Sequence, residues 1–135
     1  MGAAIRLMPA VLKIDPQRGV VCSTFHGQVT GEQLLEHRAR ILADPHFNPD
    51  FAEIVDFSTA LPGSISDETL AALAGSKSLF SESVPHVIVA PAEMPFALAE
   101  KYREFAKGSG RSLFVVRSLA DAYEVLRQHG YSADV

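Results

Sequence analysis

Short apolar runs, separated by turn residues, set out the strands of this chain. Residues 10–15 and 20–28 form two such runs, and Pro16-Gln17-Arg18-Gly19 between them suits a hairpin turn. We expect these runs to pair antiparallel. Residues 54–57 and 86–90 are almost continuously apolar, which is typical of strands covered by helices on both faces. A last strand is expected at residues 112–117.

Helix start signals alternate with these strands. Thr30 and Gln33 have the spacing of a capping box, in which the hydroxyl accepts from the first turn and the glutamine side chain reaches back. Ser66 and Ser118 are further N-cap candidates, and Pro95 suits a first helical turn. The helices are predicted over residues 31–43, 67–76, 94–108 and 119–129.

The predicted order is β-β-α-β-α-β-α-β-α, which indicates an α/β fold. Right-handed crossovers would place the later strands in one mostly parallel sheet, with the antiparallel hairpin at the N-terminus. With 135 residues, 47% hydrophobic and 21% charged, the chain is expected to form a single domain over residues 1–135.

Composition excludes several classes of function. The net charge is −4 and no basic stripe occurs, so nucleic acid is not an expected partner. Cys22 is the only cysteine, which rules out an intrachain disulfide and favours a buried, inert thiol. The N-terminal apolar run is interrupted at Lys13 and Asp15, and no apolar stretch is long enough to span a membrane. A cytoplasmic location is expected.

No sequence motif indicates an enzyme or a cofactor. The five histidines include no pair at helical metal-ligand spacing, and no metal site is expected. A nucleophile elbow, a phosphate loop and a dinucleotide fingerprint are also lacking. We therefore expect no cofactor and no catalytic residues.

The stretch AEIVDFSTALPGSISDETLAAL, residues 52–73, is the first candidate for a binding site. Its strand is predicted to end near Asp56, and a hydroxyl-rich loop then leads into the helix that begins at Asp67. Ligands of open α/β sheets bind at the carboxyl ends of strands. The polar candidates are Asp56, Ser58, Thr59, Ser64 and Ser66. The alternative is that these side chains only bind loop amides and cap the helix.

An apolar pocket is the second candidate. Aromatic and apolar residues near the third predicted helix, together with one loop residue, could bound a space for an apolar ligand. These residues are Leu61, Met94, Phe96 and Tyr102. Core packing is the alternative for most of them.

Three segments carry a resemblance to a known family. They are Gly27-Gln28-Val29-Thr30 with Glu32 opening a helix, IVDFS at residues 54–58, and RSLADAYEVL at residues 117–126. Together with the element order, they make residues 11–130 similar to the SpoIIAA-like or STAS domain, the fold of bacterial anti-sigma-factor antagonists and of small bacterial proteins of unknown role.

The resemblance implies a partner-binding domain, with one departure. The antagonists carry an Asp-Ser-Ser-Gly segment whose serine is phosphorylated, whereas the matching stretch here is Ser66-Asp67-Glu68-Thr69. A phosphate beside two carboxylates would be repelled. The phosphorylation switch is therefore not expected in this chain.

Two functions remain as hypotheses. The first is a non-enzymatic regulatory module that binds a protein partner through residues 58–67 and forms homodimers. The second is a carrier or sensor that holds a small apolar ligand or lipid between sheet and helices, as related folds do.

Overall fold

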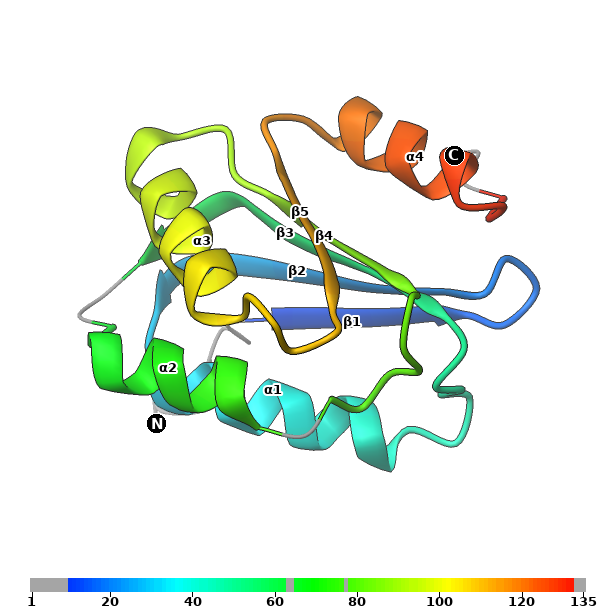
Figure 1. The fold of residues 1–135 in the computed structure, drawn as a ribbon, viewed down its shortest axis with the longest axis horizontal. Helices are drawn as coiled ribbons and strands as arrows, with labels where there is room; N and C mark the ends of the chain where they lie inside the picture. Colours follow the sequence, from blue (N-terminus) through cyan, green and yellow to red (C-terminus); the bar gives the residue numbers. More distant parts are fainter. Residues whose placement is uncertain (1–9, 63–64, 77, 133–135) are drawn as a thin grey trace, which may run out of the picture.

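The computed structural model describes residues 10–62, 65–76 and 78–132, which form five strands and four helices (Figure 1). In chain order the elements are β1 (Ala10–Asp15), β2 (Val20–Val29), α1 (Gly31–Ala43), β3 (Ala52–Pro62), α2 (Asp67–Gly75), β4 (Pro85–Val89), α3 (Glu93–Phe105), β5 (Ser112–Val116) and α4 (Leu119–Gln128).

The five strands lie in the sheet in the same order as in the chain, β1-β2-β3-β4-β5. β1 pairs with β2 antiparallel, and β2, β3, β4 and β5 run parallel to one another. The predicted α/β fold, with a mostly parallel sheet and an antiparallel N-terminal hairpin, is confirmed.

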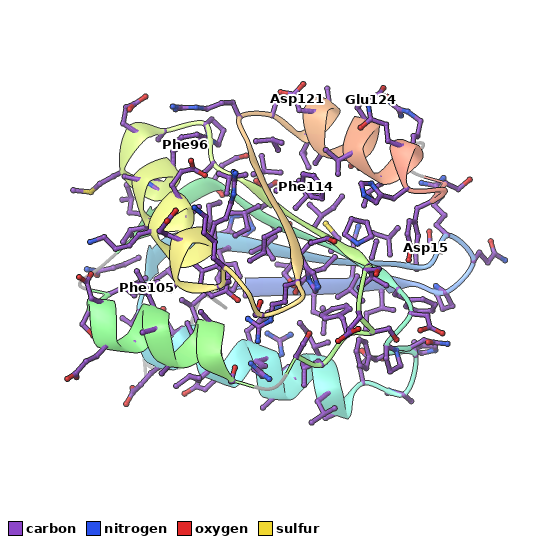
Figure 2. The ribbon with its side chains drawn as sticks, viewed as in Figure 1. Asp15, Phe96, Phe105, Phe114, Asp121 and Glu124 are labelled. Carbon is purple, nitrogen blue, oxygen red and sulfur yellow. The ribbon has the colours of Figure 1, made fainter. Side chains whose placement is uncertain are left out.

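The helices cover the two faces of the sheet unequally. Of the four helices in the described residues, α1, α2 and α3 lie on one face and α4 lies on the other (Figure 1). Under α4, buried side chains of β3 and β4 pack against Ala122 and Leu126, with Phe114 of β5 alongside (Figure 2). Because side chains alternate along a strand, the neighbours of these residues face the three-helix side. That side contains the site described below.

Local capping explains where the helices begin. The Thr30 hydroxyl accepts from the Gln33 amide at 3.3 Å, and the Gln33 side chain accepts from the Thr30 amide at 2.8 Å. Ser66 and Ser118 each accept an amide hydrogen bond at 3.1 Å from the residue three positions later. The predicted caps of α1, α2 and α4 are therefore confirmed.

The third strand is longer than predicted. The sequence indicates a strand at residues 54–57 and a loop from Ser58, but β3 continues to Pro62. Its second half pairs with β2 beyond an irregularity between Thr24 and His26, and Ala60 is buried there. The loop interpretation of residues 58–62 was wrong because the ten-residue β2 supplies pairing groups that local hydroxyl content does not reveal.

Candidate functional site

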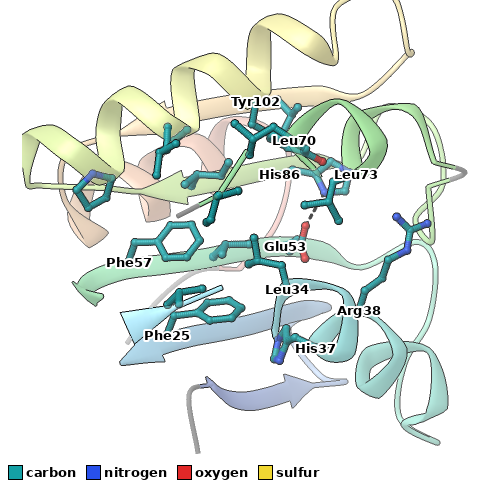
Figure 3. A pocket seen from close by; sticks show the side chains of 18 of the residues that line it. Phe25, Leu34, His37, Arg38, Glu53, Phe57, Leu70, Leu73, His86 and Tyr102 are labelled. Atoms are coloured by element: carbon teal, nitrogen blue, oxygen red, sulfur yellow. Dashed lines mark hydrogen bonds and ion pairs between the residues drawn. The ribbon is translucent and has the colours of Figure 1, made fainter. Parts of the chain in front are cut away.

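A cavity of about 190 Å³ lies between the sheet and helices α1, α2 and α3 (Figure 3). Its lining is mainly apolar. The strands contribute Phe25, Val55, Phe57 and Ile88, and the helices contribute Leu34, Leu70, Leu73 and Leu98. The four strand residues line the cavity because the alternation of side chains along each strand places them on the sheet face opposite α4. The cavity can therefore accept an apolar group.

One end of the cavity is polar. Glu53 and His86 are each the second residue of their strands, and they are register partners in the pairing of β3 with β4. Nδ1 of His86 lies 2.8 Å from Oε1 of Glu53, and the two side chains are only 7% and 17% exposed. Because the strands are parallel, this pair marks the amino-terminal ends of the strands.

Two arginines lie at the same end. Arg111 precedes β5 and donates to the Tyr102 hydroxyl at 2.9 Å, to the Leu73 carbonyl at 3.3 Å and to the carbonyl of Ser76. Arg38 of α1 donates to the Ser76 hydroxyl. Burial raises the pKa of the Tyr102 hydroxyl, so this group keeps its proton. Figure 3 shows Tyr102, His86, Glu53 and Arg38 toward one end and Phe25 and Phe57 toward the other.

His37 of α1 is a further polar group in the lining. Its Nε2 lies 2.6 Å from the hydroxyl of Ser23, which is fully buried. Its Nδ1 is buried without a hydrogen-bond partner in the described part of the chain. Burial, followed by the charge of Arg40, lowers the pKa of His37. The ring is therefore neutral at neutral pH.

Asp56 and Ser58, which the sequence suggests as binding residues, lie away from this cavity. The Asp56 side chain is on the sheet face that α4 covers, and it is 7% exposed. Its carboxylate accepts hydrogen bonds from the amide of Ser58 at 2.8 Å and from the hydroxyl of Ser58 at 2.5 Å. Burial, and then the Asp56 charge, raises the pKa of the nearby Cys22 thiol. A protonated thiol is a poor nucleophile.

The hydroxyl candidates Thr59 and Ser66 do not line the cavity either. Thr59 donates to the Phe25 carbonyl at 3.3 Å, and its hydroxyl lies 2.8 Å from Nδ1 of His26. Ser66 caps α2, and Asp67 in the first turn of α2 pairs with Lys101 at 2.9 Å. Ser64 lies outside the described residues.

Of the four apolar candidates, the structure places Tyr102 in the cavity wall. Leu61 and Met94 are 70% and 69% exposed. Phe96 packs beneath the guanidinium of Arg117, whose central carbon is 3.6 Å from the ring centroid. The predicted set is therefore not brought together.

The binding residues suggested by the sequence do not include Glu53, His86 or Arg111. For Glu53 and His86 the available signal was a polar residue at the start of each of two otherwise apolar runs, because parallel pairing places such residues side by side. The sequence predicts a site at the carboxyl ends of the strands, whereas these groups lie at the amino ends.

The described residues contain no group of three histidine, cysteine or acidic side chains placed to hold a metal ion. Within the same residues, no helix has both the length and the hydropathy needed to cross a membrane.

Comparisons with known proteins address the fold. No family model matches the chain, and no curated protein matches it. Among solved structures, it is similar to an uncharacterized protein of the DUF3478 family from Shewanella loihica PV-4, which has a SpoIIAA-like fold. The identity is 17%, the TM-score is 0.55, and the match covers 90% of this chain and 97% of the other. The resemblance seen in the sequence is thus confirmed for the architecture: this chain has a SpoIIAA-like α/β fold.

Proposed function

We propose that the protein binds a small apolar molecule, or the apolar part of a larger one, in the cavity between the sheet and α1, α2 and α3. The observation that carries this proposal is an apolar cavity of about 190 Å³ inside the three-helix side of the fold. Wall atoms that face empty space lose dispersion contacts, and an apolar ligand restores them. Cavities lined by apolar side chains stay dry and accept such ligands.

The proposal is tested by native mass spectrometry of the protein as purified, followed by titration with a neutral environment-sensitive dye such as Nile red. We expect either a co-purified mass or saturable dye binding. A protein that is empty and shows no saturable binding across a panel of apolar compounds contradicts the proposal.

A matched pair of variants locates the ligand. Val55→Phe adds volume to the cavity wall, whereas Val125→Phe adds the same volume to α4 across the sheet. We expect Val55→Phe to weaken dye binding by roughly tenfold or more, since an occupied cavity excludes the ligand. Val125→Phe should bind like the wild type. Equal binding by both variants would place the ligand elsewhere.

A partner-binding module is the second candidate. It is favoured by two exposed apolar side chains, Leu61 near the end of β3 and Met94 in the first turn of α3, the helix that follows β4. Sedimentation of the wild type and of the double variant Leu61→Ser, Met94→Ser tests self-association. A concentration-dependent dimer that the double variant loses supports a homodimer through this surface, and two monomeric samples argue against it.

A further inference from the structure

The cavity combines an apolar body with a charged end, and this combination restricts its ligand. Toward Phe25 and Phe57 the walls are apolar (Figure 3). Toward the amino ends of β3 and β4 the lining contains Arg38, Glu53, His86, Tyr102 and Arg111. A ligand that fills the whole cavity therefore needs an apolar chain and a polar head group.

The charged end favours an anionic head group. Among the described residues that line the cavity, Arg38 and Arg111 are cations, and Glu53 is the one carboxylate. Oε1 of Glu53 is hydrogen-bonded to Nδ1 of His86. This nitrogen is the donor, because an ionised carboxylate can only accept a hydrogen bond. The described lining residues at this end thus carry a net positive charge.

Hydrogen-bond donors are also available there. The bonds from Arg111 to Leu73, Ser76 and Tyr102 use three of the five N–H groups of a guanidinium. The Tyr102 oxygen accepts from Arg111, so its own O–H can donate to a further acceptor. A carboxylate beside these two side chains would receive charge-assisted hydrogen bonds in a partly buried setting, where such bonds are strong.

We infer that the ligand is a single-chain carboxylic acid, with its carboxylate at Tyr102 and Arg111 and its apolar chain directed along β3 toward Phe57. This inference rests on the proposed function and names the chemical class of its ligand.

The test compares three ligands that share one apolar chain: decanoate, decanol and decylammonium. Each is titrated calorimetrically, below its micelle concentration and at mildly alkaline pH, into the wild type and four variants. Tyr102→Phe and Arg111→Gln remove the proposed contacts. Tyr123→Phe on α4 and Arg103→Gln on the exposed side of α3 are the matched controls.

The readout is the ratio of the dissociation constants of decanol and decanoate. We expect decanoate to bind roughly tenfold or more tightly than decanol in the wild type. Tyr102→Phe and Arg111→Gln should reduce this ratio toward one while decanol binding is retained, and the two control variants should preserve it. A variant that merely perturbs the fold would weaken both ligands alike and leave the ratio unchanged.

The outcomes separate the two proposals. If decanol or decylammonium binds the wild type as tightly as decanoate, the cavity takes an apolar chain without recognising an acid, and this inference fails alone. If the ratio persists in both Tyr102→Phe and Arg111→Gln, the head group lies elsewhere and the inference is overturned. If none of the three ligands binds, both proposals fail.

Discussion

His37 is the residue at which folding and protonation are most directly coupled. Its ring packs edge-on against Phe25, with 5.0 Å between ring centroids, and is 5% exposed. One ring nitrogen is paired with Ser23, and the other has no partner within the described residues. A proton on this ring would be buried close to Arg40, which explains why the pKa is lowered.

The pH dependence of stability follows from this shift. An unfolded histidine takes up its proton near pH 6.5, and folded His37 does so only at lower pH. Between these two values the unfolded state binds more protons, so the free energy of unfolding falls as the pH is lowered. As the pH is lowered from about 7.5 to about 5.5, we expect the urea concentration at the unfolding midpoint to decrease. This decrease should be larger than in a variant without the histidine.

The matching variant is His37→Leu combined with Ser23→Ala, which removes both hydrogen-bond partners and leaves no buried hydroxyl unpaired. Its urea midpoint should vary less with pH over the same interval. An unchanged slope would mean that other groups dominate the acid sensitivity.

At the scale of elements, α1 and α2 meet at their first turns. A Cβ atom added at Gly31 would lie 2.6 Å from Cγ2 of Thr69. Real Cβ atoms do not approach so closely, so a larger residue at Gly31 must displace one of the two helices or rotate Thr69. The Thr69 hydroxyl lies 3.1 Å from that of Ser66, the cap of α2, and its rotation would disturb this contact.

We predict that Gly31→Ala lowers the free energy of unfolding by about 1–3 kcal/mol, the range of overpacking effects. Gly75→Ala at the end of α2 is the control, because a Cβ there meets nothing within 4 Å. Adding Thr69→Ser removes the clashing methyl group and keeps the hydroxyl, so it should restore most of the loss in a urea-denaturation double-mutant cycle. Additive effects in this cycle would show that the clash is not the cause.

The ends of helices and strands were predictable where nearby residues determine them, and less predictable where they depend on a strand that is distant in sequence. Thr30, Ser66 and Ser118 mark helix starts within a few residues of sequence, and each acts as the cap it was predicted to be. The end of β3 depends on β2, far away in sequence. The polar end of the cavity depends on the register that places Glu53 beside His86, which no single segment reveals.

The whole molecule has two differently packed sides. On the α4 side Leu126 is fully buried in a core with β3 and β4, and on the three-helix side Leu70 is also buried, at 4% exposed, but faces the cavity. Burial fractions alone do not distinguish these leucines. Packing does, because a side chain beside an empty space has fewer partner atoms to lose.

We predict that Leu126→Ala costs about 3–5 kcal/mol of unfolding free energy, toward the upper part of the range for buried leucines. The loss caused by Leu70→Ala should be smaller than that caused by Leu126→Ala by about 1 kcal/mol or more, since the deletion enlarges a space that already exists. Urea denaturation of the ligand-free protein measures both. Equal losses would indicate that the cavity contracts around Leu70 in solution.

The strand order has a consequence for how the protein is made. Because each strand pairs with the one synthesised just before it, the sheet can grow strand by strand as the chain leaves the ribosome, with no gap to be filled by a later segment. α4 follows all five strands in the chain and packs on the face formed by the core side chains of β3 and β4. Until it arrives, the apolar side chains of Ile54, Val87 and Val89 are exposed, and a nascent chain at that stage is the form most in need of a chaperone.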